Sequence, residues 1–215
     1  MAKERLKSPR ARLFVALDLP DAVRNGLADW QREALPDKGA LRPLAPAQLH
    51  VTLCFLSYHP ERDIERITEI VTGVPPRPVR IRFDAAPVAI PPRRPRLFAV
   101  EGTSPAAIEL QGELSDLLEA KRFYKPEKRP FWTHVTVARV RTERGAGGRG
   151  RRRGSPMRVR EAPKPLPAWL TEPFGAVRVA LYRSTLRPTG AEYSSLAELD
   201  LPPMADASAK LTRCD

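Results

Sequence analysis

The chain has 215 residues, of which 42% are hydrophobic and 29% are charged, and its formal net charge is +12. These values exclude a wholly disordered chain and a coiled coil, and they allow one domain with a sizeable core. The longest apolar run is interrupted at Asp18 and is too short to cross a membrane, and the basic start of the chain leads into no signal-type segment. Two cysteines, Cys54 and Cys214, provide neither a disulfide framework nor a thiolate metal cluster. We therefore expect a monomeric cytoplasmic protein that binds polyanions or phosphate-bearing ligands and does not interact with membranes.

The first half of the chain predicts strands that alternate with helices. Alternating apolar residues favour a strand over 12–19, and branched and aromatic residues favour another over 49–56. A helix is expected from Asp21, because Val23, Leu27, Trp30 and Ala34 fall on one stripe. A second helix is expected near Ile64 on the same grounds.

The second half predicts further strands, one more helix and a region without a core. Strands over 79–90 and 96–101 read as a hairpin, a helix is expected around 110–118, and strands are expected over 133–140, 177–186 and 191–199. The segment 142–165 is rich in Gly and Arg and lacks apolar periodicity, so it is expected to be a mobile loop. The predicted fold class is α+β, with one domain over 12–200 between tails at 1–11 and 201–215.

One tripeptide occurs twice, as His50-Val51-Thr52 and as His134-Val135-Thr136. The surrounding segments LHVTLCFL (49–56) and THVTVARV (133–140) align without a gap. Threonine makes up only about one residue in twenty, so an accidental repeat is uncommon, and an internal duplication explains the match better.

Strand geometry places the repeated polar side chains together. Residues i and i+2 of a strand point to one face, so His50 and Thr52 should project from the same side, and His134 and Thr136 likewise. Leu53 and Phe55 should point the opposite way, into an apolar layer. If a pseudo-two-fold axis relates the two halves, both His/Thr pairs line one cleft.

Two imidazoles and two hydroxyls suit in-line displacement at a phosphodiester. One neutral imidazole can accept a proton while a protonated imidazole donates one on the opposite side. The hydroxyls of Thr52 and Thr136 can donate hydrogen bonds to the nonbridging oxygens. This scheme needs no metal and no cofactor. The residues alone do not decide whether His50 or His134 is the acid.

The sequence resembles the RNA 2′,3′-cyclic phosphodiesterases of the two-histidine phosphoesterase superfamily, which were once described as 2′-5′ RNA ligases. The resemblance runs from RLFVALDLP (12–20) through both repeats and PRLFAVEG (95–102) to LYRSTLRPTGAEYSSL (181–196). It implies a bilobed, duplicated fold in which two antiparallel sheets face a central cleft, with helices outside. It also implies hydrolysis of RNA 2′,3′-cyclic phosphate ends to 2′-phosphomonoesters, with His50 as proton donor to the 3′-oxygen and His134 as proton acceptor from water.

The resemblance also points to Arg139, which matches an arginine that is expected to approach the phosphate or the RNA. Strand parity disagrees, because position 139 shares the face of Val135 and Val137, so a bulge or the end of the strand would have to redirect it. The sequence departs from the family pattern at Thr133, where Pro is frequent, at Ser57, where Gly is common, and in the longer Gly/Arg segment.

Other residues allow two readings each. Trp132 could stack on a nucleobase or pack in the core. Cys54 could lie at the cleft floor, although a buried apolar role is favoured, and His59 is expected at the surface. The basic cluster at Arg149, Arg151, Arg152 and Arg153 could follow an RNA backbone or simply be solvated. Two alternative functions remain open, a nucleotide-independent 2′-5′ RNA ligase and a noncatalytic RNA-binding module.

Overall fold

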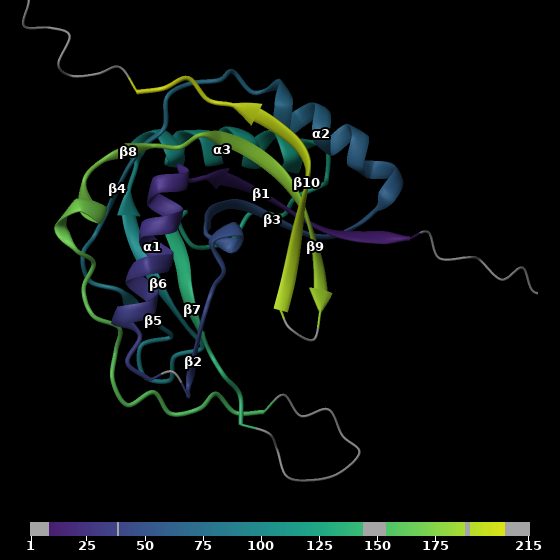
Figure 1. Ribbon diagram of the computed structural model, residues 1–215. Coiled ribbons are helices and arrows are strands. Elements are labelled where there is room, and N and C mark those ends of the chain that lie inside the picture. Colours follow the sequence, from purple (N-terminus) through teal and green to yellow (C-terminus); the bar gives the residue numbers. More distant parts are fainter. Residues whose placement is uncertain (1–8, 38, 144–153, 188–189, 205–215) are drawn as a thin grey trace, which may run out of the picture.

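The structure is a computed structural model that describes residues 9–37, 39–143, 154–187 and 190–204 (Figure 1). Residues 144–153 of the Gly/Arg segment, which include Arg149 and Arg151 to Arg153, lie outside the described residues, as do most of the two predicted tails. Among the helices described, none combines the length and the apolar character that a membrane crossing requires.

The predicted α+β class is confirmed by the order of the elements, which alternate short helices with antiparallel strands. The helices are α1 (Asp21–Ala34), α2 (Ile64–Gly73) and α3 (Pro105–Ala120), with short 3-10 helices η1 (Pro46–Gln48), η2 (Glu61–Asp63) and η3 (Ala168–Thr171). The strands are β1 (Arg10–Asp18), β2 (Leu41–Pro43), β3 (His50–Pro60), β4 (Arg80–Phe83), β5 (Val88–Ile90), β6 (Leu97–Thr103), β7 (His134–Val140), β8 (Phe174–Gly175), β9 (Arg178–Arg187) and β10 (Gly190–Asp200).

The strands form two halves of one connected sheet, rather than two separate sheets. The order is β10-β9-β1-β3-β7-β6-β4-β8, with β2 added to β7 and β5 added to β6. The segment predicted as a single strand over 79–90 divides into β4 and β5, and both pair with β6. The region predicted as a two-stranded hairpin therefore contains three strands, with β6 paired to both β4 and β5.

A single residue pair, Val51 with Val135, joins β3 to β7 within the described chain. Each of these strands is held more extensively by its own half, β3 by β1 and β7 by β6. Both valines are fully buried in the core. The boundary between the two halves thus coincides with the centres of the two repeated tripeptides.

A β-bulge follows each tripeptide at the same distance. In β3 the pairing with β1 shifts between Thr52 and Cys54, which leaves Leu53 as the extra residue. In β7 the pairing with β6 shifts between Thr136 and Ala138, which leaves Val137 as the extra residue. Because an extra residue reverses the alternation of faces, the side chains that follow it change side as far as the next irregularity.

The core fills the space between the sheet and the helices. Leu27 and Trp30 of α1 are buried, and Leu110 and Leu114 of α3 are fully buried, as the predicted stripes require. α2 packs against β9 and β10, whereas α3 packs against β3 and β4. Of the two strands that carry the tripeptides, β3 is therefore supported directly by α3.

Candidate active site

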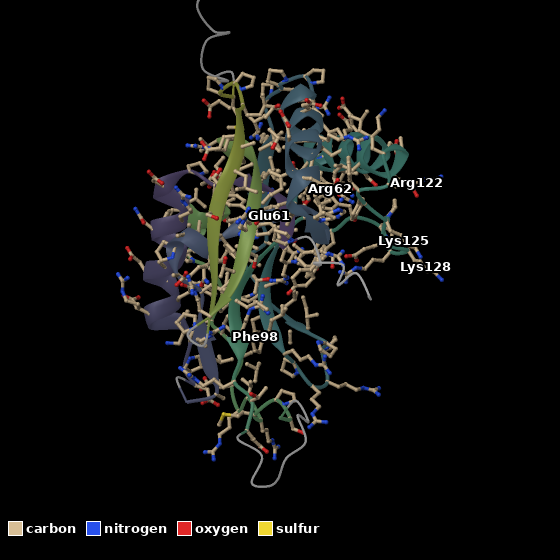
Figure 2. All side chains as sticks on the ribbon, turned by 90° about the vertical axis from the view of Figure 1, so that its right-hand side faces the viewer. Glu61, Arg62, Phe98, Arg122, Lys125 and Lys128 are labelled. Carbon is tan, nitrogen blue, oxygen red and sulfur yellow. The ribbon has the colours of Figure 1, made fainter. Side chains whose placement is uncertain are left out.

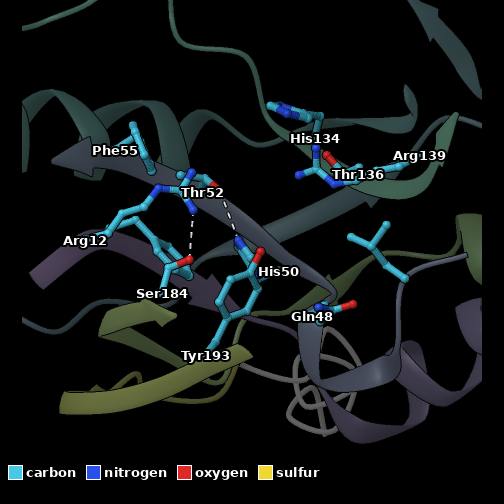
Figure 3. A pocket seen from close by; sticks show the side chains of 12 residues that line it. Arg12, Gln48, His50, Thr52, Phe55, His134, Thr136, Arg139, Ser184 and Tyr193 are labelled. Atoms are coloured by element: carbon cyan, nitrogen blue, oxygen red, sulfur yellow. Dashed lines mark hydrogen bonds between the residues drawn. The ribbon is translucent and has the colours of Figure 1, made fainter. Parts of the chain in front are cut away.

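Both repeated His/Thr pairs line one cleft of about 120 Å³ (Figure 3). The side chains that surround it come from β1, β3, β7, β9 and β10 and from the loop that contains η1. The lining residues are Arg12, Phe14, Leu44, Gln48, His50, Thr52, Phe55, His134, Thr136, Arg139, Ser184 and Tyr193.

The pairing of Val51 with Val135 sets how the four polar residues face one another. In an antiparallel pair, the residue before one partner lies beside the residue after the other. His50 therefore lies beside Thr136, and Thr52 lies beside His134, across the boundary between the two halves. The two histidines are diagonal neighbours, an arrangement that lets them approach a common ligand from opposite sides.

His50 is held by its own repeat and by aromatic rings from β1 and β10. Its Nε2 lies 3.1 Å from Oγ1 of Thr52, and its ring stacks on Phe14 at 4.9 Å and meets the edge of Tyr193 at 5.4 Å between centroids. Burial among these groups lowers the pKa of His50 to about 4, although its hydrogen bond with the backbone of Gln48 acts in the opposite direction. His50 is therefore neutral at pH 7 in the ligand-free protein.

His134 has an equivalent backbone anchor. Its Nδ1 lies 2.8 Å from the carbonyl oxygen of Trp132, which can only accept a hydrogen bond, so Nδ1 carries the proton and Nε2 is left as an acceptor. The indole of Trp132 stacks on the imidazole at 3.9 Å between centroids, with the planes 13° apart. Burial lowers the pKa of His134 as well, and this bond to the carbonyl opposes the shift. Each histidine is thus bound to the backbone two residues before it.

The two bulges correct the expected orientation of two residues. Beyond Val137 the alternation reverses, so Arg139 turns to the face of His134 and lines the cleft. The family resemblance led us to expect this position, whereas strand parity without a bulge placed Arg139 on the opposite face. Beyond Leu53 the same reversal brings Phe55 to the face of His50. The prediction that Phe55 points into the apolar layer is therefore wrong, and its ring is 41% exposed.

A second cavity of about 340 Å³ adjoins the cleft and shares Thr52, Phe55 and His134 with it. Trp132 forms part of its wall and is half-buried, so its ring both contacts His134 and faces this cavity. The remaining wall comes largely from α3 and from the segment that precedes β7, including Tyr124, Arg129 and Phe131.

Basic side chains gather outside this second cavity. Arg122, Lys125 and Lys128 project from one edge of the molecule in Figure 2, and they belong to the same segment between α3 and β7. All three are exposed. Part of the chain's large positive charge is therefore presented beside the candidate site.

Cys54 and His59 lie outside the cleft. Cys54 is fully buried and does not line the cleft, in agreement with its expected apolar role, and burial raises its pKa to about 12. His59 was expected at the surface but is half-buried, because its Nε2 lies 2.9 Å from the carbonyl oxygen of Leu56 and its ring meets the edge of Phe123. His59 does not line the cleft.

The cleft also contains residues that the repeat could not identify. Phe14 and Arg12 precede the first tripeptide by more than 35 positions, and Ser184 and Tyr193 follow the second by about 50 or more. The only local signal was the placement of Arg12 and Phe14 two positions apart in an otherwise apolar strand. Their contribution depends on the pairing of β1 with β3 and β9.

Comparison with known proteins gives a consistent result. A family model described as LigT-like phosphoesterase matches residues 17–99. An RNA 2′,3′-cyclic phosphodiesterase of Archaeoglobus fulgidus is 28% identical over 86% of this chain and 97% of its own length, and one of Thermus thermophilus is 29% identical over 88% and 90%. The solved structure of Thermus thermophilus TT0787 superposes with a TM-score of 0.72 at 25% identity, covering 88% of this chain and 97% of its own.

Proposed function

We propose that this chain, which is similar to the LigT-like phosphoesterases, hydrolyses RNA 2′,3′-cyclic phosphate ends to 2′-phosphomonoesters by metal-free acid–base catalysis. The observation that carries the proposal is the shared cleft, in which two neutral imidazoles and two threonine hydroxyls surround one small space. The names of the relatives supply the substrate class, and the cleft supplies groups suited to the reaction.

In the proposed reaction, His134 accepts a proton from a water molecule as the water oxygen bonds to phosphorus. The bond from phosphorus to the 3′-oxygen breaks, and His50, in its protonated form, donates a proton to that oxygen. The negative charge of the bound phosphate favours protonation of His50, whose pKa is low in the ligand-free protein. The two histidines have equivalent backbone anchors, so these anchors do not distinguish the acid from the base. The roles are therefore assigned from the family resemblance.

Three further groups are proposed to hold the phosphate. Thr52 and Thr136 would donate hydrogen bonds to its nonbridging oxygens, where charge increases in the transition state. The Arg139 guanidinium has no carboxylate partner among the described residues, so its charge is available to the same oxygens.

The terminal nucleobase is proposed to occupy the second cavity. Its walls contain Trp132 and Phe55, whose rings offer the flat apolar surfaces on which bases stack. The basic edge at Lys125 and Lys128 would favour a polyanionic chain nearby. We also propose that the protein acts as a monomer, in the cytoplasm, and that residues 12–200 form its catalytic domain.

The decisive experiment is turnover of a 2′,3′-cyclic nucleotide in the presence of a chelator, with the phosphate position in the product determined by NMR. The proposal predicts a 2′-phosphate and an unchanged rate with chelator. A 3′-phosphate, or loss of turnover with chelator, would contradict it.

The same preparation tests the two alternatives. Joining of RNA ends that carry a cyclic phosphate and a 5′-hydroxyl, without added nucleotide, would support the ligase. RNA binding that is lost when residues 145–154 are deleted, with no hydrolysis in the intact chain, would support the noncatalytic module. Unchanged turnover of a small cyclic nucleotide after that deletion supports the hydrolase.

A further inference from the structure

Arg12 lies in the cleft although it belongs to neither repeated tripeptide (Figure 3). It projects from β1, and its Nη1 donates a hydrogen bond to Oγ of Ser184 in β9 at 2.9 Å. Its guanidinium carbon lies 4.7 Å from the centroid of the Phe55 ring. The aromatic face and the hydroxyl together fix the position of this side chain.

The charge of Arg12 is not neutralised within the described residues. Other arginines of the same half of the sheet have carboxylate partners, as Arg183 has with Glu61 and Arg187 has with Glu192. The described contacts of Arg12 are the Ser184 hydroxyl and the Phe55 ring. A fixed guanidinium without a carboxylate, placed in a cleft wall, is suited to binding a phosphate.

We propose that Arg12 and Ser184 bind the phosphodiester that precedes the terminal nucleotide of the RNA. This inference rests on the proposed function. A terminal nucleotide presents three groups to a protein, namely its cyclic phosphate, its base and the phosphate on its 5′-oxygen. The cyclic phosphate is assigned to the two tripeptides and Arg139, and the base to the second cavity. Arg12 and Ser184 line the cleft but not the second cavity, and they provide the third contact.

A contact of Arg12 and Ser184 with this phosphate would give the enzyme a preference for RNA chain ends over nucleotides that have a free 5′-hydroxyl. The 5′-oxygen lies across the ribose from the 2′,3′-cyclic phosphate, so its phosphate must bind away from the reacting centre. A cation at that place stabilises every substrate with a 5′-phosphate and leaves a 5′-hydroxyl nucleotide unaffected. The added affinity should also decrease as the salt concentration increases.

The test compares three substrates, a cyclic mononucleotide with a 5′-hydroxyl, the same nucleotide with a 5′-phosphate, and a dinucleotide with a cyclic phosphate end. For the wild type we expect kcat/KM to be higher for the second and third substrates. Arg12→Ala should lower kcat/KM for those two about tenfold or more, mainly through KM, and should change the first less than about twofold. Arg12→Lys should retain part of the preference.

Two further variants control for charge and for position. Arg12→Gln keeps a hydrogen-bonding side chain beside Ser184 without the charge, and it should lose the preference while its melting temperature stays close to that of the wild type. Arg10→Ala changes an exposed arginine two positions earlier on β1 that does not line the cleft, and it should keep the preference.

The outcomes distinguish this inference from the proposed function. An equal loss on all three substrates would assign Arg12 to the reacting phosphate and overturn the inference. Equal kcat/KM for the three substrates in the wild type would also overturn it, with hydrolysis itself intact. A wild type that turns over none of them would refute the proposed function and this contact together.

Discussion

Leu53 and Val137 occupy equivalent places in the two halves of the protein, since each is the extra residue of a β-bulge three positions after a tripeptide histidine. The duplication is therefore retained in the backbone irregularity as well as in the tripeptide. The residue two positions beyond each bulge turns into the cleft, and there the halves differ, because one provides the ring of Phe55 and the other the guanidinium of Arg139. The two sides of the cleft therefore differ, with the Phe55 ring beside Arg12 on one side and Arg139 on the other, and this difference can orient a substrate.

Removal of either cleft imidazole should abolish most of the turnover. We expect His50→Ala and His134→Ala to lower kcat for a 2′,3′-cyclic nucleotide by about 10²–10⁴-fold each, because each removes one proton transfer. Steady-state kinetics with chelator present measures this. His59→Gln is the matched control, since His59 lies outside the cleft, and it should retain near wild-type kcat. Near wild-type kcat in either alanine variant would contradict the acid–base scheme.

Loss of the Arg139 guanidinium should weaken phosphate binding in both the ground state and the transition state. Arg139→Ala is expected to lower kcat/KM by about 10–100-fold, the effect of losing a hydrogen bond to a charged group. Arg139→Lys should recover part of it, and Arg141→Ala, an exposed arginine that does not line the cleft, should have no effect. Equal kinetics for the Arg139→Ala and Arg141→Ala variants would remove Arg139 from the site.

The indole that covers His134 should influence its protonation. Trp132→Ala exposes an imidazole whose pKa is lowered by burial, so the pKa of His134 should rise toward its ordinary value. The acidic limb of the profile of kcat/KM against pH should then move to higher pH, and kcat/KM should decrease about tenfold. Trp132→Phe keeps a stacked ring and should keep the profile. An unshifted limb in the alanine variant would show that the indole does not lower the pKa of His134.

His50 should make the fold sensitive to mild acid. Its pKa is about 4 in the folded protein, against the ordinary value of 6.5 that the imidazole has in an unfolded chain, so the unfolded chain binds more protons between these values. The free energy of unfolding is therefore fully retained above pH 6.5 and decreases as the pH falls toward 4, by about 3 kcal/mol at most from this residue.

Urea unfolding at pH 7 and pH 5 tests this sensitivity. The decrease between the two pH values should be smaller for His50→Gln than for the wild type. An identical pH dependence for the wild type and the His50 variant would show that the imidazole is not desolvated.

Ser57 has a backbone conformation that favours glycine. Its φ is 67°, and it lies at a second shift in the pairing of β3 with β1. Ser57→Gly should stabilise the protein by about 0.5–1 kcal/mol, because glycine adopts this conformation without a steric cost. Ser57→Ala keeps the Cβ atom and should give no gain. Thermal unfolding compares the two, and a gain in the alanine variant alone would contradict the explanation.

Periodicity and repetition were sufficient for much of the architecture. The helices around Leu27 and Leu110 and the strands of both tripeptides lie where the apolar spacing placed them. The convergence of His50, Thr52, His134 and Thr136 on one cleft followed from alternation of faces together with the duplication. These are local properties that short segments express directly.

The remaining features depend on pairing between distant segments. The bulges at Leu53 and Val137 arise from the register of β3 with β1 and of β7 with β6. No residue in the tripeptide segments predicts them. For that reason Phe55 was assigned to the wrong face, and Arg139 could be brought to the cleft only by resemblance. Arg12 and Ser184 meet across 172 positions of sequence, a distance that no local pattern covers.

The narrow connection between the halves of the sheet has a mechanical consequence. Backbone hydrogen bonding fixes each histidine firmly within its own half, but the halves meet through Val51 and Val135 alone in the described sheet. The width of the gap in which a phosphate would react therefore depends on the packing of these two valine side chains, together with α3, which packs against β3 of one half and β4 of the other. A change of side-chain volume at this hinge-like contact would adjust the separation of the acid and the base while leaving both of them chemically intact.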